Sequence, residues 1–527
     1  MKRNVLLIVL PYLVNPKVLV ASKRVKSFKA FPYGVLSMAT YVEKNVSYEV
    51  KIEVLDCNVY DEDFVTLIKN KLIKFKPDLV GLSMSYDVSY KYLKEAVDTI
   101  KTYSSESVLV LGGSVSTSAY DIILNEHDNI DGICYYEGEL PLLRLVNSKH
   151  MIHLLETDAS WITKKSLING RIPQKLSIVN LDEVINLDYS FVDISKYNMT
   201  EAFSPFAYKR EKGKQFFLIT SRGCPYSCAF CMRSADNDKS MRYASVEEII
   251  KHVRYLVEKN DMKILTIYDD QILLNRERVK RLFKELAQFN LRIECPNGVS
   301  VAFIDDEIAK LMRKAGMDTI QIAIESGSPY VLNKIIHKPL NLKRVKPVIK
   351  ILRKYGFWIQ GFFVSGMPGE TDEHRDETVR FIKDIGIDWA SFSLAIPTRG
   401  SELFRTCVEN GYIKNDSQIG GLHSNKFIIN TPEYSADYVI EKTYLMYLDV
   451  NFVNNYRMRN GEWRIVLSGL RSVIKRQPDH AFAYYYLARA LFNLNEIVEA
   501  QFAIDKFHEI IEKDNKWKKY AEYFKVR

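Results

Sequence analysis

Short apolar runs alternate with amphipathic helical patterns through most of the first 400 residues, and this alternation restricts the possible fold more than any other feature. In the first part the apolar runs are Val5–Val9, Val50–Leu55, Leu79–Met84, Val108–Leu111 and Gly132–Tyr135, each followed by a helical stretch. Strands separated by helices form a parallel sheet covered on both faces. We therefore predict a doubly wound α/β domain over residues 1–150.

A second series of the same kind follows an irregular connector over residues 151–215. Its six predicted strands are Phe216–Thr220, Ile264–Tyr268, Arg292–Cys295, Thr319–Ile324, Phe357–Val364 and Trp389–Leu394. Six strands with helices between them predict a partial (β/α)6 barrel over residues 216–400. In such a barrel, functional residues gather at the carboxyl ends of the strands.

Residues 401–527 form a third region, in which strand patterns give way to helical periodicity after about residue 430. Near the end, one helical pair fits the spacing of a tetratricopeptide unit through Tyr484, Leu487, Ala488, Leu491, Ala500 and Ile504. About one and a half such repeats cannot form a free-standing solenoid. We expect these helices to dock on the rest of the chain or on a protein partner.

Charge and cysteine usage exclude several classes of protein. The net charge of +9 over 527 residues is too mild an excess to indicate nucleic-acid binding. The uncharged run Asn4–Pro16 is too short to cross a bilayer, so we interpret it as a buried first strand and expect a cytoplasmic protein without a membrane partner. Seven cysteines, three of them within eight positions, fit a reducing compartment and a metal cluster better than a disulfide framework.

The three crowded cysteines, Cys224, Cys228 and Cys231, directly follow the first predicted barrel strand. The spacing Cys-x3-Cys-x2-Cys provides three thiolates, one fewer than a tetrahedral zinc ion or a fully ligated cluster needs. A [4Fe–4S] cluster held in this way keeps one iron open. The alternative is a zinc site completed by Cys295 or a histidine, although structural zinc usually has two paired ligand knuckles.

This spacing, with the aromatic Phe230 before the last cysteine, resembles the radical S-adenosylmethionine (SAM) enzymes. The resemblance implies that the open iron binds the amino and carboxylate groups of SAM. It also implies that the reduced cluster, supplied by an electron donor such as flavodoxin or ferredoxin, cleaves SAM to a 5′-deoxyadenosyl radical. That radical then removes hydrogen from an unactivated carbon.

Further motifs at the barrel strand ends resemble the SAM contacts of this family. They place Asp269 and Asp270 near the SAM ammonium, Glu325 and Ser326 near its ribose and carboxylate, and Gly366 in a turn whose strand flanks adenine. Singly, the acidic pair can cap a helix and the glycine can serve an ordinary turn. Pro397–Ser401 departs from the family's Pro-Gly-Thr turn, so the sixth-strand loop is less well predicted.

The first domain is similar to the Rossmann-like cobalamin-binding domains that precede the barrel in one branch of the family. The matching residues are Gly34, Asp56, Ser83, Gly112, Gly113, Glu137, Gly138 and Glu139. Small residues at strand ends let a flat macrocycle lie close to the backbone. No Asp-x-His-x-x-Gly occurs in residues 1–150, so we expect no histidine below cobalt. The alternative is a nucleotide-binding or structural domain, but no Gly-x-Gly-x-x-Gly opens the first helix.

Together the resemblances imply radical methylation of an unactivated carbon in a small-molecule or natural-product substrate. Methylcobalamin would donate the methyl group, and a second SAM would remethylate cobalt. Hydrogen abstraction needs no general base, so we assign no catalytic proton-transfer residue. Three alternatives stay open: cyclisation or rearrangement on the same cofactors, a non-catalytic cobalamin-binding or partner-binding protein, and, more weakly, methylthio transfer to RNA.

Overall fold

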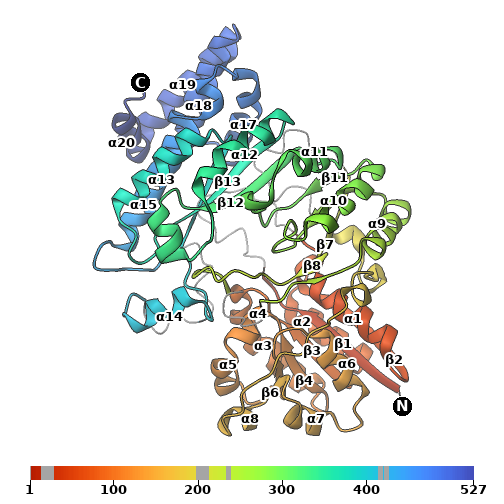
Figure 1. The fold of residues 1–527 in the computed structure, drawn as a ribbon. Coiled ribbons are helices and arrows are strands. Elements are labelled where there is room, and N and C mark those ends of the chain that lie inside the picture. Colours follow the sequence, from red (N-terminus) through yellow and green to blue (C-terminus); the bar gives the residue numbers. More distant parts are fainter. Residues whose placement is uncertain (1, 13–28, 198–212, 233–238, 414–418, 420–426) are drawn as a thin grey trace.

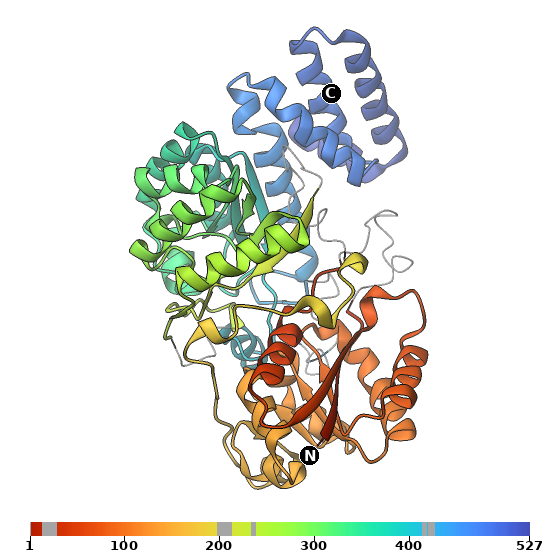
Figure 2. The same cartoon turned by 90° about the vertical axis from the view of Figure 1, so that its right-hand side faces the viewer.

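The computed structural model describes residues 2–12, 29–197, 213–232, 239–413, 419 and 427–527. The N-terminal α/β unit and the helical C-terminal region lie at opposite ends of the molecule, with the barrel strands between them (Figures 1 and 2). None of the described helices is both long enough and apolar enough to cross a bilayer.

The N-terminal unit is a six-stranded sheet of order β2-β1-β3-β4-β5-β6. Its strands are β1 (Lys2–Val9), β2 (Glu49–Asp56), β3 (Leu79–Ser83), β4 (Val108–Gly112), β5 (Gly132–Cys134) and β6 (Trp161–Ile162). The five predicted strands are parallel, whereas β6 pairs antiparallel with β5 and comes from the stretch that we expected to be connector. The strand order reverses between β1 and β3, and ligands of doubly wound sheets bind at such a switch point.

Helices cover both faces of this sheet because successive strand residues point to opposite sides. Val5 and Leu7 pack beneath α1 (Tyr33–Asn45) and α6 (Glu139–Asn147). Leu6 and Ile8 pack on the other face, against α2 (Phe64–Phe75), α3 (Leu93–Tyr103) and α5 (Tyr120–Glu126). The doubly wound prediction is confirmed.

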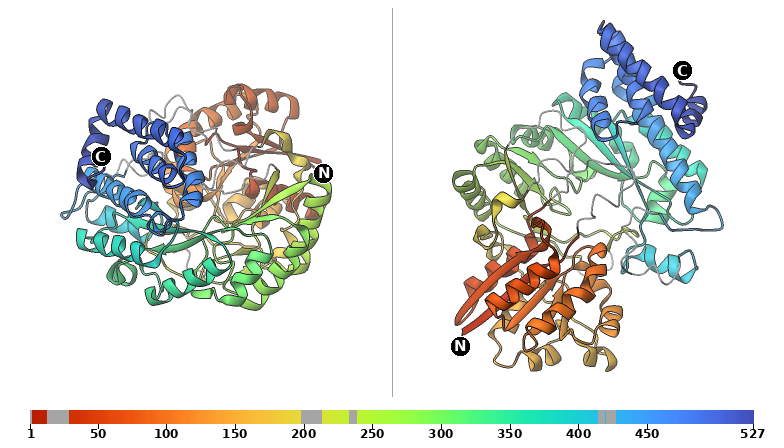
Figure 3. Two further views of the ribbon diagram at one scale, coloured as in Figure 1. Left: turned by 90° about the horizontal axis from the view of Figure 1, so that it is seen from above. Right: turned by 180° about the vertical axis from the view of Figure 1, so that it is seen from behind.

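The barrel consists of two three-stranded parallel sheets joined by a single bridge between Val299 and Ile322. The strands are β7 (Lys214–Leu218), β10 (Met262–Ile267), β11 (Arg292–Glu294), β12 (Thr319–Glu325), β13 (Trp358–Ser365) and β14 (Trp389–Leu394), close to the six predicted positions. Figure 3 shows helices arranged around the outside: α9 (Val246–Asn260), α10 (Arg276–Leu286), α11 (Asp306–Lys314), α12 (Val345–Lys354) and α13 (Asp372–Ile385). The partial-barrel prediction is confirmed.

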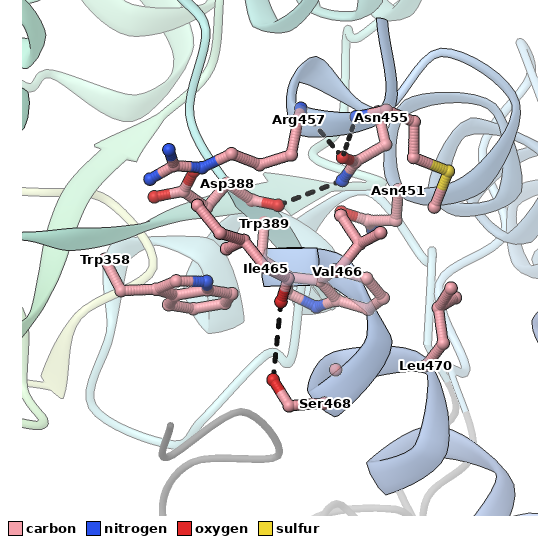
Figure 4. A pocket seen from close by; sticks show the side chains of 12 residues that line it. Trp358, Asp388, Trp389, Asn451, Asn455, Arg457, Ile465, Val466, Ser468 and Leu470 are labelled. Carbon is pink, nitrogen blue, oxygen red and sulfur yellow. Dashed lines mark hydrogen bonds and ion pairs between the residues drawn. The ribbon is translucent and has the colours of Figure 1, made fainter. Parts of the chain in front are cut away.

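The C-terminal helices dock on the edge of the barrel. After α15 (Ala436–Leu448), the Asn451 side chain accepts a hydrogen bond from the Ala390 N–H and donates one to the Ala390 carbonyl, both at 2.8 Å. Asn455 adds a bond to the Asp388 carbonyl at 3.1 Å (Figure 4). These amides replace the backbone partners that β14 lacks at its open edge. The tetratricopeptide-like helices α17 (Trp463–Arg476), α18 (Ala481–Asn493), α19 (Ile497–Lys513) and α20 (Asn515–Phe524) follow.

Candidate functional site

The cysteine loop leaves the carboxyl end of β7 and is held by the barrel on several sides. It begins with β8 (Ser221–Arg222), which pairs antiparallel with β9 (Arg242–Tyr243). In the middle of the loop, the Ala229 N–H donates to the Ile336 carbonyl at 2.9 Å, and the Ala229 carbonyl accepts from Leu403 at 2.8 Å. Cys224, Cys228 and Cys231 are half-buried free thiols, and Phe230 packs in the apolar cluster that surrounds Ala229.

The two neighbouring acids at the end of β10 have separate roles. Asp269 is buried and accepts hydrogen bonds from the Thr220 N–H at 2.5 Å and from the Thr220 and Ser221 hydroxyls at 2.6 Å. Burial raises the pKa of Asp269, and these bonds oppose the rise. Asp270 instead acts on Cys224, whose pKa is raised first by burial and then by the Asp270 charge. Asp269 therefore orients the start of the loop, while the charge of Asp270 helps to raise the pKa of the first cysteine.

Lys338 is a residue of this site that the sequence patterns did not identify. Its ammonium lies 2.8 Å from the carboxylate of Glu325, a residue with a left-handed backbone (φ 73°) at the end of β12. Burial raises the pKa of Cys228 to about 12, and the Lys338 charge acts in the opposite direction. No local motif marks Lys338, because only the chain path after the π-helix Val331–Ile336 brings it back to the cysteines.

Ser326 and Gly366 form the turns that end β12 and β13. The Ser326 hydroxyl lies 3.1 Å from the Thr378 hydroxyl. Gly366 has φ 88°, its N–H donates to Glu370 at 2.6 Å, and an added Cβ would lie 2.5 Å from the Phe427 ring. Glycine is therefore required at this turn. The contacts of both residues with SAM stay predictions.

The donor set of the cysteine loop fits an iron–sulfur cluster. Among the described residues, no three Cys, His, Asp or Glu side chains converge on the position of a single metal ion. A mononuclear zinc site needs such convergence. In a four-iron cluster, by contrast, each thiolate binds a different iron, so the three sulfurs need not meet at one point. Three half-buried thiols on one loop can each bind a different iron of such a cluster, and this ligation stays a prediction.

A small apolar cavity of about 40 Å³ lies at the carboxyl ends of β3 and β4. Ser83, Gly112 and Gly138 line it together, and none of its lining residues is a histidine. A Cβ added to Gly112 would meet its nearest neighbour, Cys134, at 4.0 Å, so a side chain would project into free space. Gly113 has φ 108°, and an added Cβ there would lie 2.5 Å from the Met84 carbonyl oxygen. The end of β4 at Gly112 thus carries no side chain toward this small cavity, and the binding of cobalamin there stays a prediction.

The remaining predicted cobalamin residues lie outside this cavity. Gly34 is exposed at the start of α1. Asp56 is buried and accepts hydrogen bonds from the Asn58 N–H at 2.9 Å and from the Tyr197 hydroxyl at 3.1 Å. Glu137 and Glu139 flank Gly138, but both form ion pairs with Arg222 in the cysteine loop, at 3.2 Å and 2.7 Å. Their contacts with cobalamin stay predictions.

Two family models match this chain. Residues 24–146 match the B12 binding domain, and residues 218–382 match the Radical SAM superfamily. The first segment contains the strand ends with Ser83 and Gly112, and the second contains the cysteine loop and most of the barrel.

Two curated relatives and one solved structure extend the comparison. An uncharacterized methyltransferase of Pyrococcus horikoshii is 28% identical over 76% of this chain and 83% of its own length. Cytidylyl-2-hydroxyethylphosphonate methyltransferase of Streptomyces wedmorensis is 27% identical over 76% of this chain and 82% of its own. The fold is similar to that of TsrM from Kitasatospora setae, solved with cobalamin and a [4Fe–4S] cluster, with a TM-score of 0.59, 15% identity and coverage of 97% and 100% of the two chains. The chain therefore combines an N-terminal segment that matches the B12 binding domain with a following segment that matches the Radical SAM superfamily, and its overall fold is similar to that of TsrM.

Proposed function

We propose that this enzyme methylates an unactivated carbon of a small molecule by radical chemistry between its two domains. One observation carries the proposal. The loop Glu137–Glu139 contains Gly138 of the sheet-edge cavity, and its carboxylates are ion-paired to Arg222, two residues before Cys224. The two candidate cofactor sites are therefore neighbours. The two methyltransferase relatives support methyl transfer as the outcome.

Three cofactors take part: a [4Fe–4S] cluster, SAM and cobalamin. When bound, the cluster supplies the electron that cleaves SAM to a 5′-deoxyadenosyl radical, and cobalamin supplies the methyl group. Cys224, Cys228 and Cys231 would hold the cluster. Ser83 and the backbone of Gly112 would support the corrinoid. Asp270 and Lys338 place one negative and one positive charge beside the cysteines, where the charged groups of SAM require partners.

The inward face of the barrel supports a polar small molecule as substrate. On β12 the residues Ile320, Ile322 and Ile324 are buried in the apolar core under the helices, so the alternate residue Gln321 faces inward. On other strands, Gln360 donates to the Ser391 hydroxyl and Gln215 to the Thr266 hydroxyl, both at 2.6 Å. Amides and hydroxyls on this face favour a substrate that carries hydrogen-bonding groups.

Three further expectations belong to the proposal. An external electron donor such as flavodoxin or ferredoxin reduces the cluster. The seven free thiols and an oxygen-sensitive cluster favour the cytoplasm as the working compartment. One side of the C-terminal helical region docks on β14. We propose that its outer side binds a protein partner.

Methyl-labelled SAM tests the proposed reaction. The protein is reconstituted anaerobically with iron, sulfide and hydroxocobalamin, then incubated with labelled SAM, a reductant and a small-molecule extract of its source. Radical methylation predicts 5′-deoxyadenosine together with a labelled small molecule. A product that forms with 5′-deoxyadenosine but contains no label would assign cyclisation or rearrangement instead.

A further inference from the structure

Four buried charges join the N-terminal sheet to the cysteine loop. Arg222 pairs with Glu139 at 2.7 Å and with Glu137 at 3.2 Å, and Arg242 pairs with Glu137 at 2.5 Å. Each of the four side chains is at most 13% exposed. Two acids from one domain are thus neutralised by two arginines from the other.

Further hydrogen bonds hold this cluster, although the buried Nε of Arg242 has no hydrogen-bond partner among the described residues. The Ser37 hydroxyl of α1 donates to Glu139 at 2.7 Å, and Arg242 donates to the Ile178 carbonyl at 2.5 Å. Both nitrogens of the Arg242 fork bind the Glu137 carboxylate, at 2.9 Å and 2.5 Å. Buried ion pairs contribute little net stability because desolvation offsets their attraction, whereas forked geometry fixes orientation. The arrangement is therefore better suited to positioning than to stabilising the fold.

The backbone on both sides of the cluster is in the left-handed region. Tyr136, directly before Glu137, has φ 82°, which costs free energy in a residue other than glycine. Gly223, directly after Arg222, has φ 107°, and an added Cβ there would lie 2.2 Å from the Ser240 carbonyl oxygen. Neither loop can slide without changing these dihedral angles. Gly138 in the cavity is therefore connected to Cys224 by a short path through Glu139 and Arg222.

We propose that Glu137, Glu139, Arg222 and Arg242 form a positioning clamp that couples the corrinoid-facing sheet edge to the cysteine loop. The inference rests on the proposed function, because it assumes that a corrinoid binds at the strand ends carrying Ser83 and Gly112. The clamp residues bind one another across the two domains, so we assign them a positioning role. They set the position of one cofactor site relative to the other, so occupancy of the sheet edge restricts motion of the cysteine loop.

Hydrogen exchange in the full-length protein, with hydroxocobalamin as the probe, tests the clamp without requiring turnover. In the wild type, we expect hydroxocobalamin to slow exchange both at the strand ends, residues 83–84 and 112–113, and in the cysteine loop, residues 221–231. In Glu139→Gln, which keeps the size of the side chain but removes its charge, exchange in the loop should rise about tenfold. Hydroxocobalamin should then protect the strand ends of this variant but not its loop.

A second ion pair between the same two domains provides the control. Arg399 binds Asp121 at 2.6 Å and donates to the Ser118 carbonyl at 2.9 Å, on elements other than the cysteine loop. The variant Asp121→Asn breaks this pair and should keep the response of the loop to hydroxocobalamin. If Glu139→Gln does not fold, as judged by circular dichroism, Arg222→Lys provides a second test. It keeps the charge but cannot contact Glu137 and Glu139 through two separate nitrogens, so the same loss of coupling is expected.

The remaining outcomes separate the clamp from the proposed function. Strand-end protection without loop protection in the wild type would overturn the clamp and leave corrinoid binding intact. The clamp would also be overturned if the folded Glu139→Gln variant still showed protection of the cysteine loop by hydroxocobalamin, as the wild type does. If the wild type does not bind hydroxocobalamin, both the clamp and the proposed function are wrong.

Discussion

Replacing Gly112 with valine tests the assignment of the cobalamin site at a position where the fold should tolerate the change. Gly112 ends β4 with an ordinary extended backbone, and an added Cβ would have no heavy-atom neighbour nearer than 4.0 Å. Gly112→Val therefore needs no backbone shift. A β-branched residue in place of glycine at a strand end should leave the free energy of unfolding unchanged or raise it by about 0.5–1 kcal/mol.

The effect on cobalamin should be much larger than the effect on folding. The valine methyl groups would enter the cavity of about 40 Å³ that Gly112 shares with Ser83 and Gly138. Forcing extra carbon atoms into a packed contact costs about 1–3 kcal/mol. This range corresponds to an increase in the Kd for hydroxocobalamin of about 5-fold to 150-fold. Gly112→Ala adds one methyl group, so its increase in Kd should lie at or below the lower end of this range.

Spectrophotometric titration with hydroxocobalamin measures these Kd values, and iron analysis of the same samples reports on the cysteine loop. We expect graded weakening from glycine to alanine to valine, with iron content and 5′-deoxyadenosine formation retained. The reasoning is refuted if a folded Gly112→Val binds hydroxocobalamin as tightly as the wild type does. It is also refuted if methylated product forms at the wild-type rate after cobalamin is lost.

Three other predictions concern the cluster, the tail and acid sensitivity. Cys224→Ala should abolish iron incorporation and SAM cleavage. Cys295→Ala, which alters a buried thiol outside the loop, should retain both. Iron analysis and assays of 5′-deoxyadenosine formation measure these two properties. Asn451→Leu leaves the buried N–H and carbonyl of Ala390 without partners, so it should lower the free energy of unfolding in urea by about 2–6 kcal/mol. Burial lowers the pKa of His480 to about 3, so its neutral form stabilises the tail above pH 6.5, and each pH unit below that removes about 1.4 kcal/mol. Urea unfolding between pH 7 and pH 5 should show this slope, and His480→Asn should reduce it without abolishing it, because burial also lowers the pKa of His252 to about 4.

Much of the fold could be predicted because strand and helix periodicities are local. The six barrel strands and the five parallel strands of the first domain lie close to their predicted ranges, since most of them are apolar or alternating runs. The strand β6 has only two residues, Trp161 and Ile162, too few for any periodicity. It exists because the edge of β5 offers backbone partners, which no local pattern reveals.

The site was less predictable where a side chain depends on a distant partner. Glu137 and Glu139 follow the end of a strand, a position where ligand-binding residues are common. Only the folded chain brings Arg222 to them. Lys338 likewise reaches Glu325 only through the path of an intervening turn. The cysteine loop could be singled out from the sequence because its three thiols lie within one short segment. Metal-ligand spacing on one loop is readable from sequence, whereas ion pairs between domains are not.

The fate of the methyl group of SAM tests radical methylation most directly. The wild-type protein, reconstituted with cluster and hydroxocobalamin, is incubated with deuterated-methyl SAM, a reductant and the small-molecule extract, and its products are analysed by mass spectrometry. We predict that 5′-deoxyadenosine forms together with a small molecule that carries the deuterated methyl group. When cobalamin is withheld, we predict that no methylated product forms, with or without the label. A labelled product that forms equally without cobalamin, or a turnover that yields 5′-deoxyadenosine while the label never reaches a small molecule, would contradict the account.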